Sequence, residues 1–190
     1  MGYPGSAQHA IRIPVEVHAI PCRRISSTAY SKFMKRHFML VLLSVLGFAV
    51  NAAELPPAED LAAAVADGAR KQQPVVVMFS SENCPFCRAV APYLEVLAKD
   101  PAYHGQAQVR LVETHNANRI LIDFDGERRS HASFADQQGV GFVPIVRFFG
   151  PHGTRLAPDM VGLGLEDFYL SYLLESVGKA RSKLKRIPSG

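Results

Sequence analysis

The stretch Pro74-Val-Val-Val-Met-Phe-Ser-Ser-Glu-Asn-Cys-Pro-Phe-Cys87 decides the fold, because it joins a buried strand to a helix that opens on two cysteines. Residues 74–79 are apolar and rich in β-branched side chains, which is typical of a central strand buried on both faces. Polar residues interrupt this run at 80–83. From Cys84 to Lys99 the sequence predicts a helix, which Pro92 is expected to kink. The apolar face of that helix is formed by Val90, Leu94 and Leu97.

Other helices and strands are predicted on both sides of this unit. A helix over residues 58–71 is expected to carry Pro56-Pro57 at its first turn, where a proline costs no hydrogen bond. The turn signals Asp125-Gly126 and Gly150-Pro-His-Gly153 are expected to end strands. The remaining strands are expected at residues 109–113, 120–124, 140–149 and 154–156, and the remaining helices at 130–138 and 165–177. These elements predict an α/β fold with a central mixed β-sheet flanked by helices on both faces.

Charge is unevenly distributed along the chain. A net charge of +4 would by itself favour nucleic acid or an anionic membrane as a partner. However, residues 1–52 hold six Lys and Arg against one acidic residue, so residues 53–190 carry fifteen basic and sixteen acidic residues. We therefore expect no nucleic-acid partner. Residues 179–190 are interpreted as a basic flexible tail, which contains Lys179, Arg181, Lys183, Lys185 and Arg186.

Residues 34–52 have the pattern of a secretory signal peptide. A basic start at 35–37 precedes an apolar run at 38–50, and small residues then fit cleavage after Ala52. The run is too short for a transmembrane helix, which needs about 20 apolar residues. We therefore predict a product that starts at Met34, reaches the periplasm and keeps no stable membrane anchor after cleavage.

The segment before Met34 does not fit an exported product. Residues 1–33, which include Cys22, are interpreted as a non-native or disordered extension, because a signal peptide should begin the polypeptide. The folded domain is expected at 53–178, since a chain of 190 residues accommodates one ordinary core plus extensions. The mature protein then has two cysteines.

Cys84 and Cys87 are the residues best suited to chemistry. Their spacing places both sulfurs on the first turn of a helix, where a disulfide can close without moving the backbone. Cys84 faces the positive end of the helix dipole and unpaired backbone N–H groups, which favour the thiolate, so we expect it to be the nucleophile. Cys87 lies one turn inward and is expected to resolve the mixed disulfide that Cys84 forms with a substrate.

A structural disulfide and half of a zinc site are the alternative interpretations of this cysteine pair. A disulfide across so short a loop constrains the unfolded chain little. Zinc needs four ligands, and the sequence has no second Cys-x-x-Cys and no paired histidine cluster. The histidines of the expected domain are scattered and are interpreted as surface residues: His104, His115, His131 and His152. We expect no metal and no cofactor besides the redox-active disulfide Cys84–Cys87.

The segment from about Pro74 to Ala180 resembles the thioredoxin superfamily. The resemblance lies in the motif Cys84-Pro85-Phe86-Cys87, in Phe79 before it, in Pro92 after it, and in Val143-Pro144 at the start of a strand. It implies a thioredoxin fold for the expected domain and thiol–disulfide oxidoreductase activity. Within the superfamily the sequence is most similar to exported bacterial thioredoxin-like proteins of the SoxW type.

The resemblance also assigns a substrate-binding loop. It implies a cis peptide at Val143-Pro144 beside the cysteines, with the backbone of Val143 exposed to pair with an extended substrate segment. An ordinary trans proline is the alternative, because X-Pro bonds are mostly trans. One departure is Met78, which occupies the position where many members carry a buried carboxylate that assists proton transfer. Glu82 is near in sequence but is expected to be exposed.

The direction of electron flow is predicted from the residues between the cysteines. Pro85-Phe86 lacks the histidine of strongly oxidising DsbA-type members and resembles the glutaredoxin dipeptide. We therefore favour a reductase of exported protein disulfides, kept reduced by a membrane electron donor. A DsbA-like oxidant that forms disulfides is one alternative. A metal-binding or chaperone module that borrows the fold, with copper held by the two cysteines and one histidine, is the other.

Overall fold

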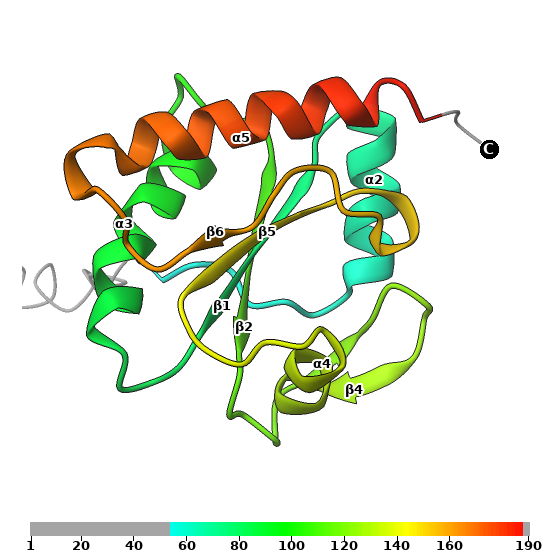
Figure 1. Cartoon of the computed structure of the whole chain (residues 1–190). Helices are drawn as coiled ribbons and strands as arrows, with labels where there is room; N and C mark the ends of the chain where they lie inside the picture. Colours follow the sequence, from blue (N-terminus) through cyan, green and yellow to red (C-terminus); the bar gives the residue numbers. More distant parts are fainter. Residues whose placement is uncertain (1–53, 188–190) are drawn as a thin grey trace, which may run out of the picture. The chain divides into compact units, whose positions relative to one another are not determined.

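A four-stranded mixed sheet in the order β2-β1-β5-β6 forms the centre of the computed structural model, which describes residues 54–187 (Figure 1). Strand β1 is central because its side chains are buried from Val75 to Phe79. It runs parallel to β2 and antiparallel to β5, and β6 pairs antiparallel with β5. The strands are β1 (Val75–Ser80), β2 (Gln108–Glu113), β5 (Ile145–Phe149) and β6 (Met160–Val161).

Helices cover both faces of this sheet (Figure 1). Helices α3 and α5 share one buried cluster with Met78, whereas α2 and α4 share a second cluster with Phe79. The two clusters alternate along β1 because successive side chains of a strand point to opposite faces. The helices are α2 (Leu61–Lys71), α3 (Pro85–Lys99), α4 (His131–Gln137) and α5 (Tyr169–Leu184). The predicted α/β fold, with a mixed sheet between two layers of helices, is confirmed.

The start of the domain differs from the prediction. Helix α2 begins at Leu61, and its N-cap is Asp60, whose carboxylate accepts the N–H of Ala63 at 2.7 Å. The two prolines precede the helix in an extended segment, 55–58, that lies beside β2. Leu111 of β2 donates its N–H to Pro56 and accepts the N–H of Ala58, both at 2.8 Å. The side chain of Leu55 is buried in the cluster of α3 and α5.

Three strand predictions also need correction. The expected strand at 120–124 is the shorter β3 (Ile120–Ile122), and it forms a hairpin with an unpredicted strand, β4 (Arg128–Ser130). The strand expected at 140–149 begins only at Ile145, because Pro144 has no N–H to contribute to the ladder. The strand expected at 154–156 is absent: after the 3-10 turn η1 (Pro151–Gly153), Arg155 makes only an isolated bridge to Phe149, and the strand that pairs with β5 is β6.

The flexible tail predicted at 179–190 is wrong for its first part. Helix α5 starts four residues later than expected, after the 3-10 turn η2 (Glu166–Phe168), and continues to Leu184. Ala180 and Leu184 are buried and extend the apolar stripe that Leu173 and Val177 begin. The basic residues of this segment occupy the other positions of the helix, which is why composition alone concealed the stripe. Among residues 54–187, no helix combines the length and apolar character that crossing a membrane requires.

Candidate redox site

The two cysteines lie where β1 passes into α3, as the sequence predicts. Cys84 is the N-cap of α3 and Pro85 its first residue, a position where proline fits the helix without losing a hydrogen bond. Cys84 and Cys87 are joined as a disulfide, with their Cα atoms 5.2 Å apart. Both sulfur-bearing residues are buried, whereas Phe86 between them is 61% exposed.

The helix start surrounds Cys84 with hydrogen-bond donors. Its Sγ accepts the backbone N–H of Cys87 at 3.0 Å, in the place where a serine or aspartate oxygen normally caps a helix. Because the first N–H groups of a helix have no partner within it and carry partial positive charge, this position favours a thiolate once the disulfide is reduced. The geometry thus distinguishes Cys84 from Cys87.

The Val143-Pro144 peptide is cis, as predicted, and it lies beside the cysteine pair. The carbonyl oxygen of Val143 is 3.9 Å from Cys84 Sγ. Pro144 is buried, and its own carbonyl accepts the N–H of Gly162 at 2.9 Å, which fixes the loop to the segment after β6. Within the described part of the chain, the N–H of Val143 makes no backbone hydrogen bond. This backbone is therefore available to pair with another chain.

Met78 belongs to the same buried cluster as Cys84 and Cys87 and is 1% exposed. Its neighbours in the sheet are Leu111 and Val146, so no carboxylate approaches from the adjacent strands at this level. A cavity of about 300 Å³ opens beside Cys87, and Met78 forms part of its wall. Its acidic lining residues are Glu54, Glu82, Glu95 and Glu113, of which Glu82 is exposed, as expected.

His131 is buried, contrary to the prediction that all four histidines are surface residues. Its Nδ1 accepts the N–H of Glu113 at 3.1 Å, and its Nε2 faces the carbonyl of Ala58 at 2.9 Å. Because a carbonyl needs a donor and an N–H needs an acceptor, the ring is neutral with its proton on Nε2. Burial lowers the pKa of His131. The ring joins segment 55–58 to the end of β2, and the other three histidines are exposed.

A cavity of about 310 Å³ beside the cis-proline loop was not predicted. Thr114 and His115 line it from the end of β2, and Phe142 and Val143 line it from the loop. Thr114 is fixed by its N–H and hydroxyl, which donate to the carbonyl of Ser80 at 2.8 and 3.2 Å. The sequence could have indicated these residues, because a strand parallel to β1 ends at the same edge of the sheet as the segment that leads to Cys84.

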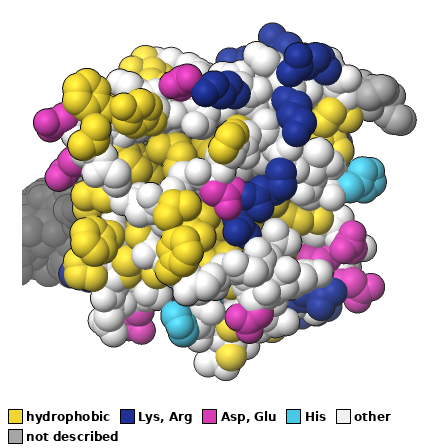
Figure 2. All heavy atoms as spheres, viewed as in Figure 1, with side chains coloured by type: hydrophobic (Ala, Val, Ile, Leu, Met, Phe, Trp, Pro, Cys, Tyr) yellow, Lys and Arg dark blue, Asp and Glu magenta, His cyan; other side chains and the backbone are white. Residues whose placement is uncertain are grey.

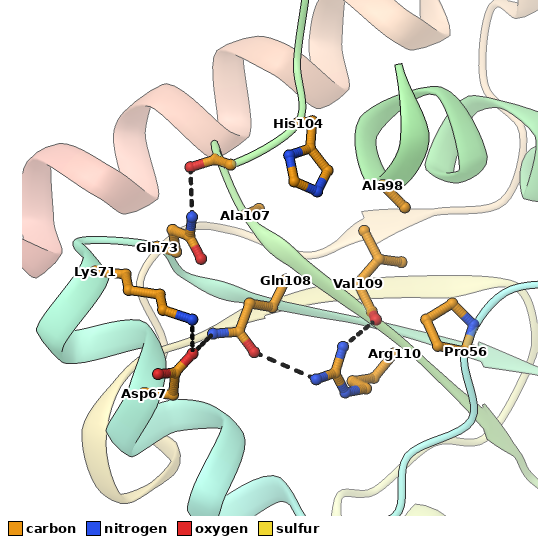
Figure 3. A pocket seen from close by; sticks show the side chains of 11 residues that line it. Pro56, Asp67, Lys71, Gln73, Ala98, His104, Ala107, Gln108, Val109 and Arg110 are labelled. Atoms are coloured by element: carbon orange, nitrogen blue, oxygen red, sulfur yellow. Dashed lines mark hydrogen bonds and ion pairs between the residues drawn. The ribbon is translucent and has the colours of Figure 1, made fainter. Parts of the chain in front are cut away.

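A further cavity, of about 390 Å³, lies at the opposite end of the sheet (Figure 3). Asp67 of α2 binds Lys71 at 2.8 Å and the side chain of Gln108 at 2.9 Å. Arg110 donates to the side chain of Gln108 and to the carbonyl of Val109 (Figure 3). Gln108 begins β2, whereas Cys84 follows the other end of parallel β1. This cavity therefore takes no part in the redox site, and its polar groups bind one another.

The mixed sheet between helices and the cysteine pair at the start of α3 are those expected of a thioredoxin-like domain. A family model described as a thioredoxin-like domain matches residues 59–173, and the chain belongs to that family. The SoxW-type assignment stays a prediction.

Individual relatives share little sequence with the chain. It is 26% identical over 108 residues to a protein disulfide-isomerase, tigA, of Aspergillus niger, which covers 57% of this chain and 26% of that protein. The chain thus spans about a quarter of that relative. A mutant thioredoxin of Halobacterium salinarum is 19% identical with a TM-score of 0.42, covering 68% of this chain and 96% of that one. A DsbH oxidoreductase is 16% identical with a TM-score of 0.43, covering 74% and 92%.

Proposed function

We propose that this protein reduces disulfides of exported proteins, with Cys84 as the nucleophile and Cys87 as the resolving thiol. The proposal rests on one observation above all, the N–H of Cys87 held at 3.0 Å from Cys84 Sγ at the helix start. Such a contact stabilises negative charge on this sulfur in preference to that of Cys87. Phe86, which is exposed between the two cysteines, offers a substrate an apolar contact beside this sulfur.

The reaction proceeds in two exchanges. The Cys84 thiolate attacks one sulfur of a substrate disulfide, so that a mixed disulfide forms and one substrate thiolate leaves. Cys87 then loses its proton and attacks Cys84 Sγ, which releases the second substrate thiolate and closes the Cys84–Cys87 disulfide. Two electrons pass to the substrate, and the two leaving thiolates take up protons. A membrane electron donor must then reduce the disulfide of the enzyme.

The cis-proline loop holds the substrate during both exchanges. An extended substrate segment pairs with the free backbone N–H of Val143 and brings its own sulfur toward Cys84, 3.9 Å from the Val143 carbonyl oxygen. Pro144 holds this loop in place through its carbonyl, which accepts the N–H of Gly162, while Pro85 and Phe86 are exposed between the two cysteines. Main-chain pairing of this kind supplies affinity without dependence on the substrate side chains.

A trapping experiment tests the assignment of roles. A Cys87→Ser variant should accumulate a mixed disulfide between Cys84 and exported proteins, because the second exchange is blocked. A Cys84→Ser variant should accumulate none and should fail to reduce insulin. Equal trapping by both variants would contradict the assignment.

The reducing direction and the periplasmic location are tested in the cell. The signal-peptide pattern at 34–52 supports export, and the absence of histidine between the cysteines supports a reductase. Alkylation of free thiols in intact cells should find the Cys84–Cys87 pair mainly reduced, and cell fractionation should find the protein in the periplasm. A predominantly oxidised pair would favour the DsbA-like oxidant instead. N-terminal sequencing should find the mature chain beginning at Ala53.

A further inference from the structure

An exposed apolar surface extends from the redox site to the start of α5. Figure 2 shows hydrophobic side chains gathered on the side of the molecule that carries α3, the segment after β6 and the beginning of α5. A monomeric protein seldom exposes large contiguous apolar patches unless they bind something. The large apolar side chains exposed on the redox-site loops, on β6 and at the start of α5 are Phe86 (61%), Phe142 (60%), Val161 (52%), Leu165 (64%), Phe168 (55%) and Tyr172 (48%). We call Leu165, Phe168 and Tyr172 the apolar platform.

The platform is held firmly on the body of the protein. The hydroxyl of Tyr93 on α3 donates to the carbonyl of Glu166 at 3.2 Å, which anchors η2. The Tyr93 ring also packs on buried Tyr169, with ring centroids 5.0 Å apart. On the outer side, Phe168 and Tyr172 lie with ring centroids 6.4 Å apart. The exposed side chains therefore belong to an ordered surface, which lowers the entropy cost of binding.

The platform is continuous with the place where a substrate would bind. Gly162, which donates to the carbonyl of Pro144, is followed after two residues by Leu165. Val161, the residue before Gly162, lies on β6, which is an edge strand of the four-stranded sheet. A segment that begins at the Val143 backbone can therefore continue along β6 and reach the platform.

Negative charge borders the platform. Glu166 and Asp167 lie between Leu165 and Phe168, and both are exposed. Within the described residues, no Lys or Arg comes within ion-pair distance of either carboxylate. A partner that covers the apolar side chains while carrying basic residues would satisfy both features.

We infer that the platform binds an apolar segment with Lys or Arg residues in an unfolded protein substrate, and so makes the enzyme prefer unfolded proteins to small disulfides. The inference rests on the proposed function and names its substrate class. An unfolded chain suits this surface because it can present backbone to Val143 and apolar side chains to the platform together. A folded protein keeps such side chains buried.

The test compares two disulfide substrates of one reduced enzyme. One is a peptide of about twelve residues, long enough when extended to span both features, with apolar and Lys residues after a cysteine disulfide-bonded to a small fluorescent thiol. The other is bis(hydroxyethyl) disulfide. A variant with Leu165→Ser, Phe168→Ser and Tyr172→Ser should lower kcat/KM for the peptide by about tenfold or more, chiefly through KM, because the buried apolar area is lost. Its activity on the small disulfide should stay within about twofold.

Two controls make the result specific. Ile120→Ser alters a large apolar side chain that is 43% exposed on β3, away from the platform, and should change neither rate. A variant with Glu166→Gln and Asp167→Asn should raise KM for the Lys-containing peptide without changing the activity on the small disulfide. Added salt should remove the difference in KM between this variant and the parent. Thermal unfolding confirms that each variant folds.

The outcomes separate this inference from the proposed function. If no substrate is reduced by the parent enzyme, the proposed function fails. If the parent reduces both substrates and the platform variant has the same kcat/KM as the parent for each of them, the inference is overturned. Sedimentation that finds a dimer in the parent and a monomer in the platform variant would also overturn it, because a second copy would then cover the surface. Binding of the parent to lipid vesicles that the variant loses, without a peptide effect, would likewise reject a polypeptide partner.

Discussion

Met78→Asp places a carboxyl group in the wall of the cavity that opens beside Cys87. Met78 is 1% exposed, so the substitution removes a buried apolar side chain, which contributes about 1.5–3 kcal/mol. The new carboxyl group also loses part of its hydration, at a further cost of about 1–3 kcal/mol. Because the cavity of about 300 Å³ can admit water, we expect a total loss in the lower half of the summed range, about 2.5–4 kcal/mol.

The substitution should nevertheless speed the second exchange. In the parent protein position 78 holds no carboxylate, so we expect Cys87 to give its proton to water or to a glutamate of the cavity, and the rate of resolution should rise with pH as the thiolate fraction rises. A carboxylate beside Cys87 acts as a general base, which commonly contributes about 10²-fold or more. We therefore expect faster resolution below neutral pH and a flatter pH profile.

Stopped-flow absorbance measures this step directly. Reduced enzyme reacts with an aromatic disulfide whose thiolate is coloured, so that attack by Cys84 releases the first thiolate and attack by Cys87 releases the second. The second phase is followed from acid to alkaline pH. Met78→Leu, a substitution of similar volume without a charge, is the control and should keep the parent profile. A folded Met78→Asp protein whose second phase follows the Met78→Leu profile would refute the reasoning.

Three further predictions concern stability and are checked by denaturant unfolding. Burial lowers the pKa of His131, so below about pH 6.5 the unfolded protein binds a proton at this residue that the folded protein does not bind. The free energy of unfolding should therefore fall as the pH falls, by up to about 1.4 kcal/mol per pH unit. His131→Gln should flatten this decline, and an unchanged slope would contradict the assignment. Gly68→Ala should cost about 1–3 kcal/mol because its Cβ would lie 2.4 Å from the carbonyl oxygen of Gln73, whereas Gly178→Ala, with no atom within 4 Å, should gain about 0.5–1 kcal/mol. Leu184→Ala should lower the free energy of unfolding by about 2–3 kcal/mol, and a loss near zero would instead support the predicted flexible tail.

The sequence predicted what depends on local pattern. The apolar run at 74–79 and the two cysteines at a helix start each have a physical signature within a few residues, and both were placed correctly. The cis peptide at Val143-Pro144, by contrast, was predicted from the family resemblance and not from the local sequence pattern.

Long-range packing accounts for the errors. Nothing near His131 in the sequence reveals that Ala58 and Glu113 supply partners for both of its ring nitrogens. The end of α5 was missed because Gly178 and the basic residues around it suggest a tail, whereas Leu184 reaches a core that the sequence does not display. The cavity at His115 required knowledge of which strand ends lie together.

Segment 55–58 has a consequence for maturation of the protein. The expected cleavage after Ala52 leaves two residues before Leu55, which is buried, and three before Pro56, whose carbonyl binds Leu111. A protease that cut a few residues after Ala52 would remove segment 55–58 from its place beside β2 and expose the apolar cluster that Leu55 covers. We therefore expect that folding of segment 55–58 would protect a chain end produced at Ala53 from further trimming.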